Sequence, residues 1–174
     1  MDLPAALLSA GIQGVVFALA ALGLLALARK LPWRELAGGV HLNLLLGFAV
    51  CLTLIWSMKA GVKPGLNLHL LGAMAATLAL GPWKAIAALA LALCGITLNG
   101  ALEWGDWPAN FVLMVLVPVS VASGLHRLIE RLLPAHFFIF IFVTGFAGSA
   151  LTAIAQGLTA SSVLALRSEE HTSE

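Results

Sequence analysis

The chain has 174 residues, of which 61% are hydrophobic and only 10% are charged, and its mean hydropathy is +1.02. A soluble domain of this size cannot hide so much apolar surface, because a small globule leaves a large part of its area in contact with water. The formal net charge of +1 gives no concentrated basic face, so nucleic-acid binding is excluded as a function class.

The apolar runs are long and continuous, and the charged residues gather in short clusters between them. Backbone groups in lipid must pair within a helix or a closed barrel, and these runs lack the alternating pattern of barrel strands. We therefore expect an all-α, polytopic transmembrane bundle that forms a single domain over residues 1–166. The two cysteines, Cys51 and Cys94, fall inside apolar runs and are expected to be thiols within the membrane, without a disulfide or a zinc site.

About six spans are predicted, at 4–28, 39–58, 66–81, 83–103, 109–125 and 135–158, and residues 159–166 are a candidate start of a seventh. The first run lacks the basic start of a signal peptide and is expected to be retained. With the N-terminus outside, six Lys and Arg residues fall in the inner links and two in the outer links. The inner set is Arg29, Lys30, Arg34, Lys84, Arg127 and Arg131, and the outer set is Lys59 and Lys63. This asymmetry favours an external N-terminus.

The third predicted span is short. As a helix, residues 66–81 would be about 24 Å long, against a hydrocarbon core of about 30 Å. Such a helix begins below the membrane surface, thins the bilayer, or is lined by protein and water at its outer end, where Asn67 and His69 fall. A neutral imidazole is the commonest metal ligand and suits nickel or cobalt, and an amide oxygen is a weak partner. The alternative is a histidine that hydrogen-bonds a neighbouring carbonyl. His41 and Asn43, on the inner side, are interpreted as an interfacial anchor.

A second outer cluster of polar residues follows the fourth span. It consists of Asn99, Glu103, Asp106 and Asn110. Carboxylates around a vestibule raise the local concentration of cations. The same link carries Trp104 and Trp107, which are also typical of an aromatic belt at the membrane interface. Both interpretations remain open from the sequence.

The inner side carries an amphipathic segment. Residues 126–136 place Arg127, Glu130 and Arg131 opposite a run of leucines, which predicts a segment that lies along the inner surface and either anchors the chain or docks a cytoplasmic partner. Upstream, Pro118 is expected to bend the fifth span, because it lacks a backbone donor. Residues 167–174 break from the apolar composition and are expected to be a non-native or disordered tail.

An intramembrane enzyme is disfavoured. Ser123 is the one serine in a context loosely like that of an intramembrane protease, but it is assigned to the inner end of its span and His69 to the outer end of another, so nucleophile and base do not meet. The two aspartates, Asp2 and Asp106, form no pair within the spans. A membrane scaffold or assembly protein remains the main alternative to a transporter.

Two motifs carry a family resemblance. The stretch HLLGAMAATLALGPW, residues 69–83, and the Asn-x-x-x-Met spacing of NFVLM, residues 110–114, resemble the CbiM/NikM family of substrate-specific membrane components of energy-coupling factor (ECF) transporters for cobalt and nickel. The resemblance implies a component in the plasma membrane that is not an enzyme and has no permanently bound cofactor. It captures Co²⁺ or Ni²⁺ from outside, and a transmembrane coupling subunit and cytoplasmic ATPases drive release inward.

The resemblance also implies a metal site. The family's ligand histidine falls on His69, and family members complete the site with the amino terminus and a histidine at position two. Here position two is Asp2, a harder ligand than histidine. The expected metal-binding residues are therefore His69, Asn67, Asp2 and Asn110, with Asn99, Glu103 and Asp106 lining the outer vestibule.

Overall fold

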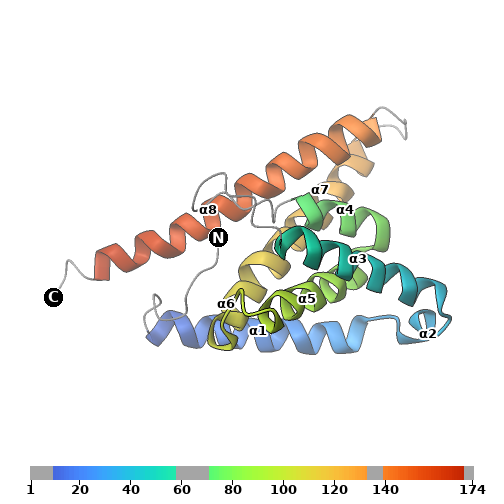
Figure 1. The fold of residues 1–174 in the computed structure, drawn as a ribbon. Helices are drawn as coiled ribbons and strands as arrows, with labels where there is room; N and C mark the ends of the chain where they lie inside the picture. Colours follow the sequence, from blue (N-terminus) through green and yellow to red (C-terminus); the bar gives the residue numbers. More distant parts are fainter. Residues whose placement is uncertain (1–9, 58–70, 133–138, 171–174) are drawn as a thin grey trace.

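The computed structural model describes residues 10–57, 71–132 and 139–170, and every element in these ranges is helical (Figure 1). The elements are α1 (Ala10–Lys30), α2 (Trp33–Leu36), α3 (Val40–Ser57), α4 (Leu71–Leu80), α5 (Pro82–Leu98), the 3₁₀ turn η3 (Trp104–Asp106), α6 (Trp107–Phe111), the π-helical η4 (Val112–Leu116), α7 (Val117–Leu132), the π-helical η5 (Ile139–Ala147) and α8 (Gly148–Glu170). The all-α prediction is confirmed for these residues.

Three helical stretches in the described residues are long and apolar enough to cross a membrane: Gly11–Lys30, Val40–Ser57 and Trp104–Leu132. Pro82–Leu98 is also an apolar helix, but it is shorter. Large apolar side chains, such as Phe17 and Leu22 on α1 and Leu54 on α3, are exposed along these helices. So large an apolar exterior is typical of a surface that faces lipid.

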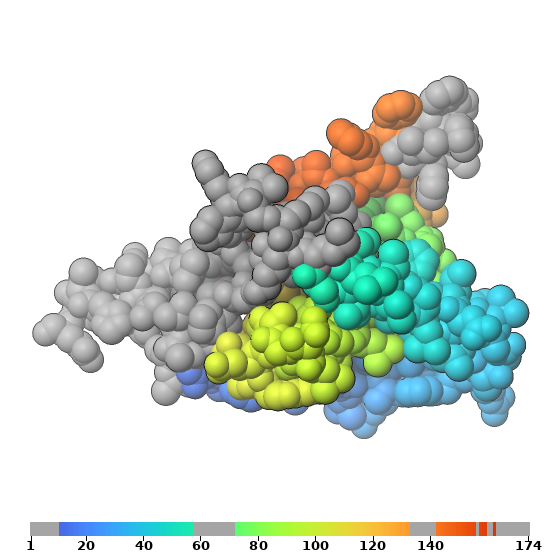
Figure 2. Space-filling model, in the orientation of Figure 1, coloured from blue at the N-terminus to red at the C-terminus, as the bar shows by residue number. Residues whose placement is uncertain are grey.

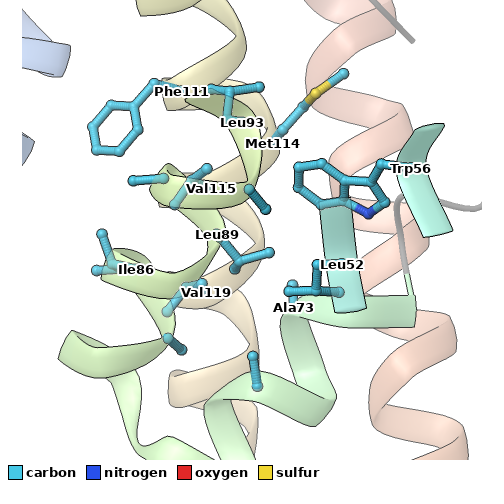
Figure 3. Packing of buried hydrophobic residues seen from close by; sticks show 14 of the residues in the cluster. Leu52, Trp56, Ala73, Ile86, Leu89, Leu93, Phe111, Met114, Val115 and Val119 are labelled. Carbon is cyan, nitrogen blue, oxygen red and sulfur yellow. The ribbon is translucent and has the colours of Figure 1, made fainter. Parts of the chain in front are cut away.

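The core lies where α3, α4, α5 and the η4–α7 helix meet (Figure 3). Its largest fully buried side chains include Leu89 and Leu93 of α5 and Phe111 of α6. Small residues bring the helices close, as at Gly72, where an added Cβ would collide with Leu52, and at Gly148, where it would lie 2.7 Å from Met74 Cε. Gly72 and Gly148 therefore mark close contacts between helices.

Sequence features explain where α5 begins and ends. Gly81 has a φ of 80° and precedes Pro82, which occupies the first helical position, where its missing N–H costs nothing. At the other end Gly100 has a φ of 74°, and its N–H donates to Thr97 O at 3.0 Å while the Ala101 N–H donates to Ile96 O at 3.0 Å. This glycine-based cap ends the helix before residue 103, the predicted end of the span.

The fifth predicted span is longer than expected. The structure continues the helix without a break from Trp104 to Leu132, so residues 126–132 form the last turns of α7 and not a separate segment along the surface. No proline or glycine lies between Leu125 and Leu132 to end the helix. The effect of Pro118 appears one turn earlier, as the widened turn of η4, in which the Val117 N–H donates to Val112 O, five residues back.

The candidate seventh span is wrong. Residues 159–166 continue α8, which runs unbroken from Gly148 to Glu170. Gly157 does not interrupt this helix, since a glycine in a helix costs only ~1 kcal/mol relative to alanine. The hydroxyl groups of Thr159 and Ser162 donate to carbonyls four residues back, at 2.7 and 2.8 Å, and so are satisfied within the helix.

Candidate functional site

The predicted outer cluster of polar residues lies at one end of the bundle, where α5 turns through η3 into α6 (Figure 1). Asn99 is the exposed C-cap residue of α5, and Glu103 is exposed at the start of η3. Asp106 ends η3 and is half-buried. The backbone N–H of Asp106 donates to Glu103 O at 3.1 Å, which closes the turn. The two carboxylates therefore belong to one compact connection.

Asn110 lies one helical turn below this connection and has no exposed surface. Its side-chain Nδ2 donates to the backbone oxygen of Asp106 at 3.0 Å. The other buried polar residues in the described ranges are threonines, and three of them, Thr77, Thr97 and Thr152, donate to carbonyls of their own helices. Asn110 is thus the one amide fully buried in the described part of the chain. Burying an amide costs free energy unless it is hydrogen-bonded, and the bond to Asp106 O offsets part of that cost and ties α6 to η3.

The face of α6 and η4 that carries Asn110 continues to Met114, about one turn further along the helix. Met114 is buried in the same cluster as Trp56, which lies in the last turn of α3, and Figure 3 shows Trp56 turned inward on the side of the cluster that Met114 occupies. The first turn of α4 packs on α3 through Gly72 and Leu52. Met114 therefore shares the buried cluster with the end of α3, whereas Asn110, one turn earlier, lies on α6, which packs against α1 and α5.

Aromatic rings flank Asn110. Trp107 and Phe111, four residues apart, stack with centroids 5.0 Å apart and ring planes at 7°. Trp104 is exposed, whereas Trp107 is half-buried. An aromatic belt was one of two open interpretations of these tryptophans, and neither predicted this stack, although the i, i+4 spacing of Trp107 and Phe111 was a usable signal.

The three residues expected to bind metal besides Asn110, namely His69, Asn67 and Asp2, lie outside the described residues. Among the residues that the structure describes, no group of three or more His, Cys, Asp or Glu side chains is arranged to hold a metal ion. The described part of the site therefore supplies an amide and an acidic connection, and it does not by itself form a complete metal-binding site.

The predicted docking residues lie at the opposite end of the bundle. Arg127, Glu130 and Arg131 are exposed on the last turns of α7, and His126 Nε2 lies 3.4 Å from Glu130 Oε1. Leu128 and Leu132, on the same turns, are also exposed. These turns present both charged and apolar side chains, which is typical of an amphipathic surface.

One protein-family model matches nearly the whole chain. The family model CbiM, described as a cobalt uptake substrate-specific transmembrane region, matches residues 2–174. No curated protein and no solved structure matches the chain. The apolar helices agree with a membrane protein. The chain belongs to the CbiM family and is a transmembrane, substrate-specific component for cobalt uptake rather than an enzyme.

Proposed function

We propose that this chain is the substrate-capture component of an ECF-type ABC transporter that takes up a divalent transition metal, Co²⁺ or Ni²⁺. Its membership of the CbiM family supports this proposal. In the proposed arrangement the chain crosses the plasma membrane about six times with its N-terminus outside, and it captures the ion at its outer end. A transmembrane coupling subunit and cytoplasmic ATPases supply the energy, and the metal ion is the substrate, not a resident cofactor.

The observation that carries the proposed site is the fully buried Asn110 beneath the connection that bears Glu103 and Asp106. An amide oxygen is a ligand that divalent ions accept, and it carries no charge that would have to be buried when the site is empty. Asp106 and Glu103 raise the local concentration of cations at the mouth. The proposed path therefore runs from these carboxylates, together with Asn99, to an inner site that contains Asn110.

The proposed inner site also takes His69, Asn67 and Asp2. The described chain resumes at Leu71, two residues after His69, and consecutive Cα atoms are about 3.8 Å apart, so the Cα atoms of these two residues are at most about 7.6 Å apart. Leu71 begins α4, whose first turn packs against Leu52, one turn before Trp56. The assignment of His69 to the proposed site rests on the family resemblance of residues 69–83, and the uptake of an H69A variant tests it.

The proposal is tested by replacing His69 with alanine and measuring cobalt and nickel uptake in cells that express the complete transporter. We expect H69A to lose most of its uptake, because the imidazole is the strongest ligand in the proposed set. His41→Ala removes a histidine at the opposite end of the bundle and serves as the matched control, with uptake preserved. Unchanged uptake in H69A would refute the site.

A binding measurement on the isolated chain separates capture from transport. A ligand that binds only the folded state stabilises it by ~2.7 kcal/mol at a hundred times its dissociation constant, so Co²⁺ is expected to raise the midpoint of thermal unfolding. H69A and Asn110→Leu, which removes the amide while retaining similar bulk, should both reduce this rise. A scaffold or assembly protein would show no metal-dependent shift in the unmodified chain.

We further propose that the last turns of α7, with Arg127, Glu130 and Arg131, dock the coupling subunit. All three side chains are exposed, so charge reversal leaves the core intact. The double variant R127E/R131E should keep the Co²⁺-dependent rise in thermal midpoint and lose uptake, because capture and energy coupling use opposite ends of the bundle. If R127E/R131E instead loses metal binding, this division of roles is wrong.

A further inference from the structure

A group of basic side chains lies where α1 ends and the chain turns through α2. Arg29 and Lys30 occupy the last turn of α1, and Arg34 lies on α2. All three are exposed, and we call them the α1–α2 basic patch. Figure 2 shows the residues around this turn at the end of the molecule, to the right in that view. The patch is separate from the α7 turns assigned to partner docking.

Several contacts hold the turn in place. Leu31 and Leu36 are buried in a small cluster with Leu45 of α3 and Ala88 of α5. The indole N–H of Trp33 donates to Ala28 O at 2.8 Å, across the turn. The patch is therefore a fixed arrangement of cations on a packed corner, and binding to it requires little further ordering of the backbone.

Contacts with α5 also fix the corner. Lys30 Nζ lies 5.1 Å from the centroid of the Trp83 ring, a cation–π contact that orients the ammonium group without neutralising it. Lys84 Nζ donates to Glu35 Oε2 at 2.6 Å. The Lys84 charge is thus matched by the only carboxylate on α2.

The three cations of the patch have no such compensation. No carboxylate in the described part of the chain forms an ion pair with Arg29, Lys30 or Arg34. The hydrogen bond and charge of Lys84 lower the pKa of Glu35, so this carboxylate stays ionised and committed to Lys84. Among the described residues, no carboxylate neutralises these three positive charges, so the corner attracts an anionic partner.

The surroundings of the patch indicate which anion it fits. The exposed apolar side chains of α1, including Leu22 and Leu25, lead along the helix to Arg29. Trp33, which is 60% exposed, begins α2, and Val40, which is 75% exposed, begins α3. Tryptophan beside Lys and Arg at the end of an apolar helix is typical of the depth at which phospholipid headgroups lie. A soluble anion or an acidic protein would not require the apolar flank.

We propose that the α1–α2 basic patch binds the headgroup phosphates of anionic phospholipids, with the flanking apolar side chains against the acyl chains. Arginine matches phosphate geometry with paired donors, and basic residues next to a membrane helix are drawn to anionic lipid. This lipid site goes beyond the capture of metal. It would fix the depth of α1 and of the α2 corner in the bilayer, and it does not depend on which face of the membrane the corner occupies.

The test compares the full chain in vesicles of phosphatidylcholine alone and in vesicles that also contain phosphatidylglycerol. We expect phosphatidylglycerol to raise the thermal midpoint of the unmodified chain. R29Q/R34Q, which changes only exposed side chains, should match the unmodified chain in phosphatidylcholine and lose most of the rise. R127Q/R131Q removes two arginines from the same end of the bundle and should keep it. High salt should diminish the rise, because exposed charges are screened.

Other outcomes overturn the proposal. If phosphatidylglycerol leaves the midpoint unchanged, or if R29Q/R34Q responds as strongly as R127Q/R131Q, the patch is not a lipid site. A rise of equal size from soluble glycerol phosphate in phosphatidylcholine vesicles would identify a free phosphate and not a lipid as the ligand. The Co²⁺-dependent shift of R29Q/R34Q is measured in the same preparations, so failure of the lipid site is distinguishable from failure of the metal site.

Discussion

Gly95 on α5 packs against Thr53 on α3. A Cβ atom at residue 95 would lie 2.8 Å from both Cγ2 and Oγ1 of Thr53. The Thr53 hydroxyl donates to Ala49 O at 2.8 Å, and a β-branched side chain in a helix has few alternative rotamers. The Thr53 side chain therefore cannot change rotamer without losing its hydrogen bond to Ala49 O. There is no room for a side chain at residue 95.

We accordingly expect Gly95→Ala to destabilise the folded chain by about 1–3 kcal/mol, the usual cost of adding volume to a packed core. Gly47→Ala on α3 is the control, since nothing lies within 4 Å of its added Cβ, and alanine should gain about 0.5–1 kcal/mol of helix stability there. Denaturation of the detergent-solubilised full chain measures both. Thr53→Ala combined with G95A should recover most of the loss, and a G95A variant as stable as G47A would contradict the packing argument.

Asn110 shows which site properties the sequence could and could not supply. Its membership of a polar cluster with Asp106 was predictable from residue type and spacing alone. Its complete burial was not, because burial depends on α1, α5 and the start of η4 packing around α6. The ion pair between Glu35 and Lys84 could not be predicted from local sequence patterns either, because the two residues are 49 positions apart. Contacts between distant segments are set by the tertiary fold.

At the scale of elements, hydrophobic runs located the helices but not their ends. The predicted span 39–58 nearly coincides with α3 (Val40–Ser57), because Gly38 and Gly39 precede its apolar run. The helix through residues 104–132 and the helix α8 both exceed their predictions. The polar residues that follow positions 125 and 158 were interpreted as ends of spans, yet the helices continue through them. The charged side chains at 126–131 lie on the surface of α7, and the hydroxyls of Thr159 and Ser162 donate to carbonyls of α8. Helices end where the backbone is interrupted, not where polarity begins.

The short helix α2 is joined to α5 by the Glu35–Lys84 pair, and this contact makes a prediction about pH. Because the pKa of Glu35 is lowered in the folded chain, chiefly by the hydrogen bond from Lys84, the unfolded chain binds more protons as the pH falls. The pair therefore contributes stability above the ordinary glutamate pKa of 4.5, and this contribution is lost as the pH falls through the lower folded-state value.

Glu35→Gln should have a slightly lower thermal midpoint than the unmodified chain at neutral pH, and the difference should shrink and disappear well below the ordinary glutamate pKa of 4.5. The effect is small because the Glu35 carboxylate is largely exposed. Lys84→Gln provides the matched background, in which adding E35Q should change the midpoint little. A difference between E35Q and the unmodified chain that persists undiminished in acid would show that Glu35 acts through something other than its charge.

At the scale of the whole molecule, the Lys and Arg residues of α1, α2, α5 and α7 gather at one end of the bundle. The end formed by the C-termini of α1 and α7 and the N-terminus of α5 carries Arg29, Lys30, Arg34, Lys84, Arg127 and Arg131. The other end carries Glu103 and Asp106, between α5 and α6. Figure 1 shows that α2 and the end of α7 lie toward one side and α6 toward the other. A bundle with this polarity has one orientation favoured by the excess of Lys and Arg on cytoplasmic segments.

The proposed orientation is tested with single cysteines at the two ends, in a background where Cys51 and Cys94 are alanine. Ala37 and Gly105 are both exposed, and an added Cβ at Gly105 meets no neighbour within 4 Å, so A37C and G105C should fold normally. A membrane-impermeant maleimide applied to intact cells should label G105C at once and A37C only after lysis. The reverse pattern would place the acidic connection inside, where Glu103 and Asp106 could not gather an external ion, and would overturn uptake through that end. Because labelling requires neither metal nor partner subunits, it decides the orientation independently of whether His69 binds the ion.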